Sequence, residues 1–245
     1  MHIPNYWQHT KAESIPSTVK LQSVFHDYAH PGDKVLDIGC GSGYSCDQLV
    51  STGFDVTGVD VNHDSLKQAS LSSKAKEHIG NLFFLQADAG DLPFANGTFD
   101  IAIMQAFLTT IATKEDRVKV LRESHRVLKP QGCLYIADFG QTWHLKTYRE
   151  RYINDLPITK EEGSIIAYDQ TSGEVAYIAH HFTEKELVFL LVENGFEIKF
   201  FRNEKFTTRT GNRVNGFVFV GRKGRIIIFL FPDPTTSTET NFYML

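Results

Sequence analysis

The sequence of 245 residues lacks several features that would define a protein class at once. It has only three cysteines (Cys40, Cys46 and Cys133), an odd number without the spacing of a metal site. We therefore expect reduced thiols in a cytoplasmic protein, with neither a disulfide scaffold nor a metal centre. No apolar run approaches the roughly 20 residues of a membrane helix, the nearest being Ile226–Phe231. The first residues also lack the basic and apolar blocks of a signal peptide.

An excess of positive charge is absent as well. The chain has 25 Lys and Arg residues against 29 Asp and Glu residues, a formal net charge of −4. Because a nucleic-acid-binding face normally needs strong positive charge, this balance favours a small-molecule partner. The hydrophobic fraction of 42% is enough for one sizeable α/β domain with an added element.

Short apolar runs alternate with amphipathic segments over the first part of the chain. Strands are predicted at 34–38, 54–59, 81–86, 99–104 and 132–138, with helices at 44–51, 63–77 and 113–128. Strands that alternate with helices at this spacing indicate βαβ units. The sequence therefore predicts a mostly parallel sheet that is covered on both faces.

The pattern changes after Asp138. Residues 139–181 carry aromatic and histidine side chains without a steady helical period, and a β-hairpin is predicted within them. The sequence Thr183–Glu186 is a capping box that predicts a helix through Glu193. The predicted hairpin strands are 164–169 and 174–181, and two later strands are predicted at 196–202 and 214–221.

A glycine-rich loop is the most informative segment. Gly39, Gly41 and Gly43 lie where a predicted strand turns into a helix, so that the backbone can fold tightly and a ligand can approach it. A dinucleotide site would need the spacing G-x-G-x-x-G, which is not present. Asp37 would repel a pyrophosphate but attract an amino group. The loop therefore favours a zwitterionic or cationic ligand, with an unliganded tight turn and a nicotinamide site as alternatives.

The segment Asp37-x-Gly39-x-Gly41-x-Gly43 resembles motif I of the class I S-adenosylmethionine (SAM) dependent methyltransferases. Four further landmarks follow in order: Gly58–Asn62, Phe84–Phe94, Phe99–Gln105 and Arg126–Gly132. Residues 181–221 resemble the last helix and the terminal strand pair of the same family. The resemblance is to its small-molecule, ubiquinone/menaquinone methyltransferase-like branch.

This resemblance implies a Rossmann-like fold with a seven-stranded, mostly parallel sheet whose last strand is antiparallel. It divides the chain into a covering segment (1–30), a SAM-binding domain (31–221) and a tail (222–245). Within the domain, residues 139–181 are expected to form a lid insert over the methyl acceptor. Tyr6 and Trp7 would cover the cofactor or, alternatively, dock on the core.

The resemblance also implies which residues hold SAM. Asp60 would accept hydrogen bonds from both ribose hydroxyls, and Asp88 from the adenine amino group. Asp37 would act through loop geometry and water on the methionyl amine. The predicted cofactor residues are Asp37, Gly39, Cys40, Gly41, Gly43, Asp60, Val61, Asp88, Ala89 and Gln105.

A general base is harder to assign. Many small-molecule relatives place histidines just after the fourth strand, but this chain has Phe107-Leu-Thr-Thr110 there. The substitutes are His144, Tyr177 and His181 in the insert, with Tyr177 and His181 predicted on one face of a strand and His180 on the other. Each of them could instead build a hairpin edge or face solvent.

The expected activity is methyl transfer from SAM to an oxygen or nitrogen atom of a small metabolite, such as a natural product or a cofactor precursor. The alternative is a catalytically inactive SAM-binding partner or sensor, which the missing histidines favour. The sequence has neither the Asn/Asp-Pro-Pro-Tyr/Phe segment nor the Pro-Cys pair that relatives use on nucleic-acid bases. No nucleic-acid, membrane or metal partner is therefore expected.

Overall fold

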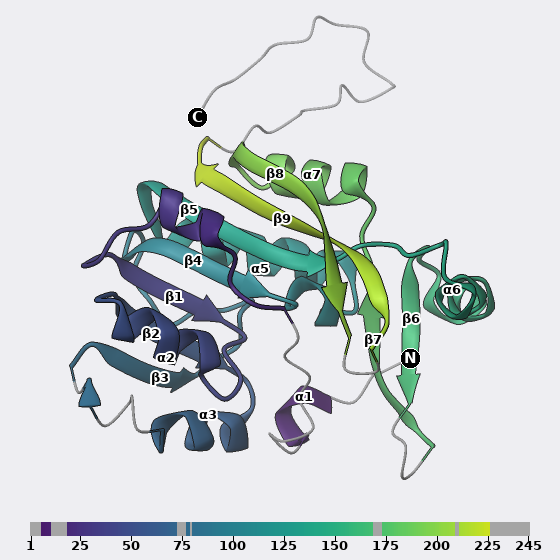
Figure 1. Ribbon diagram of the computed structural model, residues 1–245, viewed down its shortest axis with the longest axis horizontal. Helices are drawn as coiled ribbons and strands as arrows, with labels where there is room; N and C mark the ends of the chain where they lie inside the picture. Colours follow the sequence, from purple (N-terminus) through teal and green to yellow (C-terminus); the bar gives the residue numbers. More distant parts are fainter. Residues whose placement is uncertain are drawn as a thin grey trace, which may run out of the picture.

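Seven strands form one sheet in the order β3-β2-β1-β4-β5-β9-β8 (Figure 1). Their bounds are β1 (Lys34–Ile38), β2 (Asp55–Asp60), β3 (Leu82–Gln86), β4 (Phe99–Gln105), β5 (Leu128–Phe139), β8 (Phe196–Thr207) and β9 (Arg213–Lys223). Neighbouring strands from β3 to β5 are parallel, whereas β9 runs antiparallel to both β5 and β8. The predicted Rossmann-like sheet with an antiparallel last strand is confirmed.

The computed structural model describes residues 6–10, 19–72, 77–78, 80–168, 173–208 and 211–225. The apolar run Ile226–Phe231 and the rest of the tail lie outside the described residues. So do residues 73–76 of the helix predicted at 63–77. The helices are α1 (Tyr6–His9), α2 (Tyr44–Ser51), α3 (His63–Ser70), α5 (Lys114–Val127), α6 (Lys146–Thr159) and α7 (Glu184–Glu193), with 3-10 turns at Ser23–Asp27 and Leu108–Thr110.

Side chains at the helix starts bind the free backbone N–H groups there. The Thr183 hydroxyl accepts from the N–H of Glu186, and the Glu186 carboxylate accepts from the N–H of Thr183. This is the predicted capping box, and it is confirmed. Asn62 caps α3 by accepting from the N–H of Ser65 at 2.8 Å. Such caps contribute about 1 kcal/mol each and fix where a helix begins.

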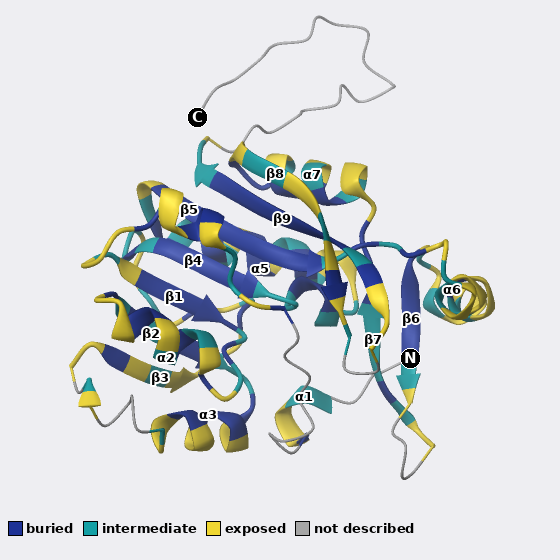
Figure 2. Cartoon of the chain, in the orientation of Figure 1, coloured by how far each residue is buried: buried dark blue, intermediate teal, exposed yellow. Residues whose placement is uncertain are grey.

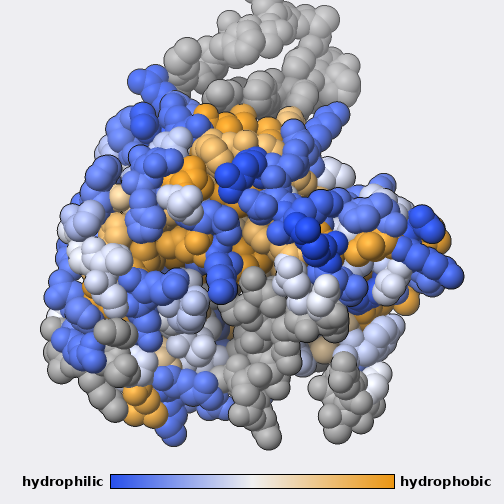
Figure 3. Space-filling view, viewed as in Figure 1, coloured by the Kyte–Doolittle hydropathy of each residue, from blue (hydrophilic) through white to orange (hydrophobic). Residues whose placement is uncertain are grey.

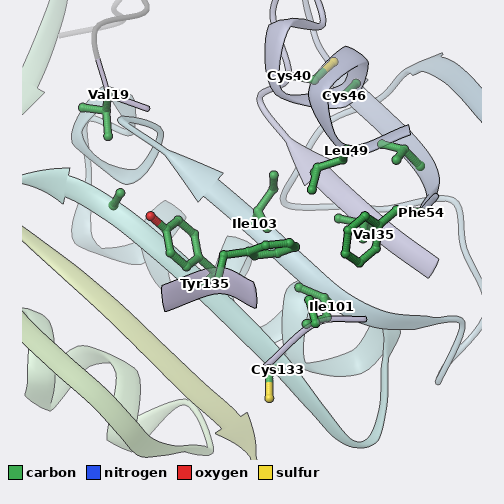
Figure 4. Packing of buried hydrophobic residues seen from close by; sticks show 14 of the residues in the cluster. Val19, Val35, Cys40, Cys46, Leu49, Phe54, Ile101, Ile103, Cys133 and Tyr135 are labelled. Carbon is green, nitrogen blue, oxygen red and sulfur yellow. The ribbon is translucent and has the colours of Figure 1, made fainter. Parts of the chain in front are cut away.

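The sheet separates two apolar clusters because successive strand side chains point to opposite faces. Val35 belongs to the cluster covered by α2 and α3, and Leu36 to the one covered by α5 and α7. Figure 4 shows the first cluster, with Cys40 and Cys46 beside Leu49. Figure 2 shows that the central strands are buried on both sides, as a parallel sheet requires.

The insert after β5 contains a helix that the sequence did not predict. The hairpin itself is confirmed as β6 (Ser164–Tyr168) and β7 (Val175–His180), which pair antiparallel. Before it, α6 buries only Tyr152 and leaves Ile153 and Ile158 more than half exposed. Figure 3 shows hydrophobic surface on the side of the molecule where α6 lies. The apolar residues of α6 therefore follow no helical period. Its place is fixed instead by the Arg151 and Asp155 side chains, which bond the backbone of Ile166 in β6.

Strands β8 and β9 are longer than predicted. They pair from Phe196 opposite Lys223 to Thr207 opposite Arg213, whereas the apolar runs end earlier. The backbone groups of the added residues are satisfied by hydrogen bonds between the two strands. The pairing, and not the apolar pattern, therefore sets the length of both strands.

Candidate active site

The glycine loop joins β1 to α2 at the carboxyl edge of the sheet. Gly39, Gly41 and Gly43 have φ angles of +75°, +53° and +80°, which L side chains rarely adopt. A Cβ atom on Gly39 would lie 2.2 Å from Cδ2 of Phe107, and one on Gly43 would lie 2.9 Å from Cζ of Phe84. A Cβ on Gly41 would meet open space. Gly39 and Gly43 thus allow the loop to pack, and Gly41 leaves an approach for a ligand.

Asp60 ends β2 and holds this loop. One carboxylate oxygen accepts the N–H of Gly41 and the other accepts the N–H of Asn62, each at 2.8 Å. Burial raises the pKa of the carboxyl group, although these hydrogen bonds oppose the rise. A carboxylate offers about four acceptor positions, so two remain for a ligand. These free acceptor positions fit the hydroxyl donors of a ribose diol, as the sequence predicts for Asp60.

Asp37 is buried at the end of β1. The thiol of Cys46 donates to its carboxylate at 3.2 Å, and no ion pair joins Asp37 to a cation in the described part of the chain. Burial raises the pKa of Asp37 to about 7, with the Cys46 hydrogen bond opposing and the Asp60 charge adding to the rise. An ammonium group of a ligand would offset this uncompensated charge. The site thus fits the amino group of a zwitterionic ligand.

The other predicted cofactor residues line the same edge. Asp88 is exposed, and its carboxylate accepts the N–H of Gly90 at 2.8 Å, while Ala89 is buried below it. Val61 follows Asp60 directly, and Cys40 is buried within the glycine loop. Gln105, the last of the predicted cofactor residues, ends β4.

In the structure the Gln105 side chain is engaged within the protein. Its oxygen accepts from the Ser45 hydroxyl at 2.6 Å, and its amide donates to the carbonyl of Val19 at 3.1 Å. Gln105 therefore ties α2 and the N-terminal segment to the end of β4. No pattern in the sequence predicts these contacts, because Ser45 and Val19 are distant from Gln105 along the chain.

Helix α1 lies between α3 and β7 at this edge (Figure 1). The Asn62 amide donates to the carbonyls of Trp7 at 2.6 Å and Thr10 at 2.7 Å. On the other side, the Tyr177 ring lies 4.5 Å from the ring of Trp7 and 5.4 Å from that of Tyr6. The N-terminal aromatic pair thus contacts the insert. Asn62 was missed as a site residue, although its place before a helix predicted at 63 signals a cap.

The three predicted catalytic residues lie in different surroundings. His144 is exposed before α6, and Tyr177 is half-buried against the rings of α1. His181 is buried among the rings of Phe139, Tyr148 and Tyr152. Their catalytic roles stay predictions.

His181 has a hydrogen-bond partner within the insert. The Tyr152 hydroxyl accepts the N–H of Thr142 at 3.1 Å and lies within hydrogen-bond distance of Nδ1 of His181, at 2.7 Å. Burial lowers the pKa of His181 to about 3, and the neighbouring His180 and Arg151 add to the effect. His181 is therefore neutral at physiological pH.

A buried ionic network ties the insert to the domain. Arg117 of α5 pairs with Glu161 and donates to the carbonyl of Ile111 at 2.9 Å. His180 bonds Glu186 of α7 through Nε2 at 2.9 Å and Ser164 through Nδ1 at 2.9 Å. The acceptor atoms of Glu161, His180 and Glu186 lie within 4.8 Å of one another, a spacing that could hold a metal ion. Arg117 already supplies a cation to Glu161, so this network is explained without a metal.

Together, the parallel sheet, the glycine loop after its first strand and the carboxylate at the end of its second define a nucleoside-binding α/β protein of the class I methyltransferase type. The comparisons with known proteins agree. Residues 36–136 match the family model described as a methyltransferase domain. Within the described residues, no helix is long and apolar enough to cross a membrane.

Among curated proteins, ubiquinone/menaquinone biosynthesis C-methyltransferases of Shewanella sp. (strain ANA-3) and Shewanella sediminis are 31% and 32% identical over 176 residues, which cover 69% of this chain and 68% of each relative. A crystal structure of a SAM-dependent methyltransferase from Methanosarcina mazei is 46% identical, with a TM-score of 0.77, and covers 84% of this chain and 99% of that one. The chain belongs to the class I SAM-dependent methyltransferases, and its cofactor is SAM.

A third comparison shows the fold alone. The 1,6-didemethyltoxoflavin-N1-methyltransferase of Burkholderia thailandensis, solved with 1,6-didemethyltoxoflavin and S-adenosylhomocysteine, has a TM-score of 0.60 at 18% identity and covers 82% of this chain and 76% of that one. The same architecture therefore occurs in a protein solved with both a small molecule and S-adenosylhomocysteine bound.

Proposed function

We propose that this methyltransferase acts on an oxygen or nitrogen atom of a small, partly apolar metabolite. The observation that carries the proposal is the aromatic cluster of Tyr6, Trp7 and Tyr177, which joins α1 to the insert at the carboxyl edge of the sheet. Aromatic walls favour a compact apolar ligand with few polar groups. The small molecule in the Burkholderia thailandensis structure supports this acceptor class.

The residues of the chain would act mainly by holding the two reactants. SAM supplies a methyl group that is already activated on a sulfonium. Asp60 and the backbone around Gly41 would hold its nucleoside, and Asp37 would face its amino group. Proper alignment of two bound reactants contributes about 7–11 kcal/mol to lowering a barrier. Positioning is therefore the main catalytic task of this site.

A base is required only if the acceptor carries a proton that must leave. We propose His144, Tyr177 and His181 as the candidates, with different properties. Because burial lowers the pKa of His181 to about 3, it would remove a proton only weakly. Tyr177 lies against Trp7 and would orient the acceptor.

A carbon acceptor is the second candidate, since the curated relatives are C-methyltransferases. Both candidates are tested by one experiment. The protein is incubated with SAM carrying a ¹³C-methyl group and a panel of phenols, hydroquinones, amines and heterocycles, and the products are examined by NMR. A methyl carbon attached to O or N supports the first proposal, and one attached to carbon supports the second. Label found only in added protein, DNA or RNA would contradict a small-molecule acceptor.

We also infer that the enzyme works in the reducing cytoplasm. Cys40, Cys46 and Cys133 are all free thiols and all buried. This supports the expectation drawn from their odd number. Mass spectrometry of alkylated protein from cells would find three reduced thiols, whereas a stable disulfide would contradict the inference.

A further inference from the structure

Asn62 connects the carboxylate of the cofactor site to the N-terminal helix. Its backbone N–H binds Asp60 at 2.8 Å. Its side chain, 1% exposed, binds the carbonyl of Trp7 in α1 and that of Thr10 just after α1. The same side chain accepts the N–H of Ser65 and so caps α3. Asn62 therefore contacts Asp60, the start of α3 and the N-terminal segment that contains α1.

Helix α1 depends on a small number of contacts. It is four residues long, and none of these residues is buried. Apolar burial therefore does little to keep α1 in place. The two bonds from Asn62 hold it on the cofactor side, and the ring contacts with Tyr177 hold it on the insert side. Without Asn62, the cofactor side would lose these anchors.

In this position, α1 also leaves one polar group unsatisfied. The indole N–H of Trp7 is buried and has no hydrogen-bond partner among the described residues. A buried donor without a partner is unfavourable, so its burial here is favoured when a ligand supplies an acceptor. A ligand beside Trp7 would therefore stabilise this position of α1.

We propose that Asn62 is a positioning residue that holds α1 closed over bound SAM or S-adenosylhomocysteine and thereby sets how fast they leave. The proposal rests on the cofactor and is independent of the acceptor. Asn62 touches neither reacting atom. Its effect passes through the Trp7 and Thr10 carbonyls, so breaking these bonds opens α1 while Asp60 and the glycine loop remain intact.

The test compares Asn62→Asp with Asn62→Ser. Both keep an oxygen that can cap α3. The first removes both amide donors, and the second is neutral and too short to bind the two carbonyls together. Loss of two hydrogen bonds at about 1 kcal/mol each corresponds to about 30-fold. We expect S-adenosylhomocysteine to dissociate about 10- to 30-fold faster from both variants, as measured by stopped-flow displacement.

A second readout follows α1 directly. The chain has two tryptophans, so Trp143→Phe leaves Trp7 as the single fluorophore. In that background, acrylamide should quench Trp7 more strongly in both Asn62 variants, in the absence of any ligand. The matched control is Asn194→Asp, which removes another buried amide donor, to the carbonyl of Leu190, at the end of α7. It should change neither the dissociation rate nor the quenching.

Two outcomes would overturn the proposal. One is an unchanged dissociation rate in folded Asn62 variants, and the other is faster dissociation with unchanged Trp7 quenching, which would place the effect at Asp60. If both Asn62 variants fail to fold, Tyr177→Leu loosens the other attachment of α1 and must raise both the rate and the quenching. A wild-type protein that binds no S-adenosylhomocysteine would instead contradict the cofactor assignment itself.

Discussion

The ring of Phe107 lies directly on Gly39, so that a Cβ atom added to the glycine would come within 2.2 Å of Cδ2 of the ring. The two residues belong to different strand ends, β1 and β4, that pair in parallel. Ala106 between β4 and Phe107 has a φ of +50°, which turns the chain there. The segment that replaces the histidines of many relatives is therefore used to support the glycine loop.

This contact predicts that two similar glycine substitutions lower the free energy of unfolding by different amounts. Both Gly39→Ala and Gly41→Ala place a side chain at positive φ, which costs about 1 kcal/mol. Gly39→Ala must also displace Phe107 and should cost about 2–4 kcal/mol in total. Urea denaturation measures the difference. Phe107→Ala should recover part of the loss in Gly39→Ala, and equal costs for the two glycine variants would show that the ring is not a constraint.

Asp60→Ala should weaken the binding of S-adenosylhomocysteine by about 1–3 kcal/mol, because the ligand loses a charged hydrogen-bond acceptor. Isothermal titration calorimetry measures this directly. Asp91→Ala is the control, since Asp91 is exposed in the following turn and should leave the affinity unchanged. Unaltered affinity in Asp60→Ala would contradict the assignment of Asp60 to the ribose hydroxyls.

The buried carboxyl group of Asp37 predicts a pH dependence of stability. Its pKa is raised from 3.8 to about 7 by burial, so the folded state binds the proton more tightly than the unfolded state does. The free energy of unfolding should therefore fall as pH rises from about 4 to 7, by up to about 4 kcal/mol. Asp37→Asn should flatten this fall and stabilise the ligand-free protein above pH 7. Burial also raises the pKa of Asp138 to about 7, so part of the pH dependence of stability should remain in Asp37→Asn.

Equilibrium unfolding at pH 5 and pH 8 tests the prediction for Asp37. The informative quantity is the change in the free energy of unfolding between pH 5 and pH 8 in the wild type, minus the same change in Asp37→Asn. The same slope in both proteins would mean that Asp37 is solvated or paired in solution.

Buried His181 predicts a pH dependence of stability that is opposite in sign to that of Asp37. Burial lowers its pKa from 6.5 to about 3, so the unfolded state binds the proton more tightly. Stability should be lost as pH falls from about 6.5 to 3, by up to about 5 kcal/mol. His181→Gln should lose less between pH 7 and pH 4, as measured by thermal or urea unfolding. His144→Gln, the same change at an exposed position, should follow the wild type, and identical acid sensitivity in all three proteins would argue against a neutral buried His181.

The sequence predicted the sheet because its central strands are buried on both faces and therefore apolar throughout. It did not predict α6, whose burial falls on Tyr152 while Ile153 and Ile158 are exposed, so no helical period is visible. The hydrogen bonds from α6 to Ile166 define this helix, and only the folded chain brings the two together. For the same reason the ends of β8 and β9 follow their pairing.

The residues of the site likewise include some that the sequence predicts and others that only the folded structure reveals. The glycine loop, Asp37 and Asp60 are local in the sequence, because each lies at the end of a strand whose apolar pattern marks where it stops. Phe107 against Gly39, Asn62 against Trp7 and Arg117 against Glu161 join residues from separate elements. These pairs form because of how the elements pack. A hydrogen bond or ring contact depends on distances in the folded chain, which residue spacing along the sequence does not predict. That this enzyme binds SAM follows from local sequence patterns, whereas the contacts around its site follow from how the elements pack.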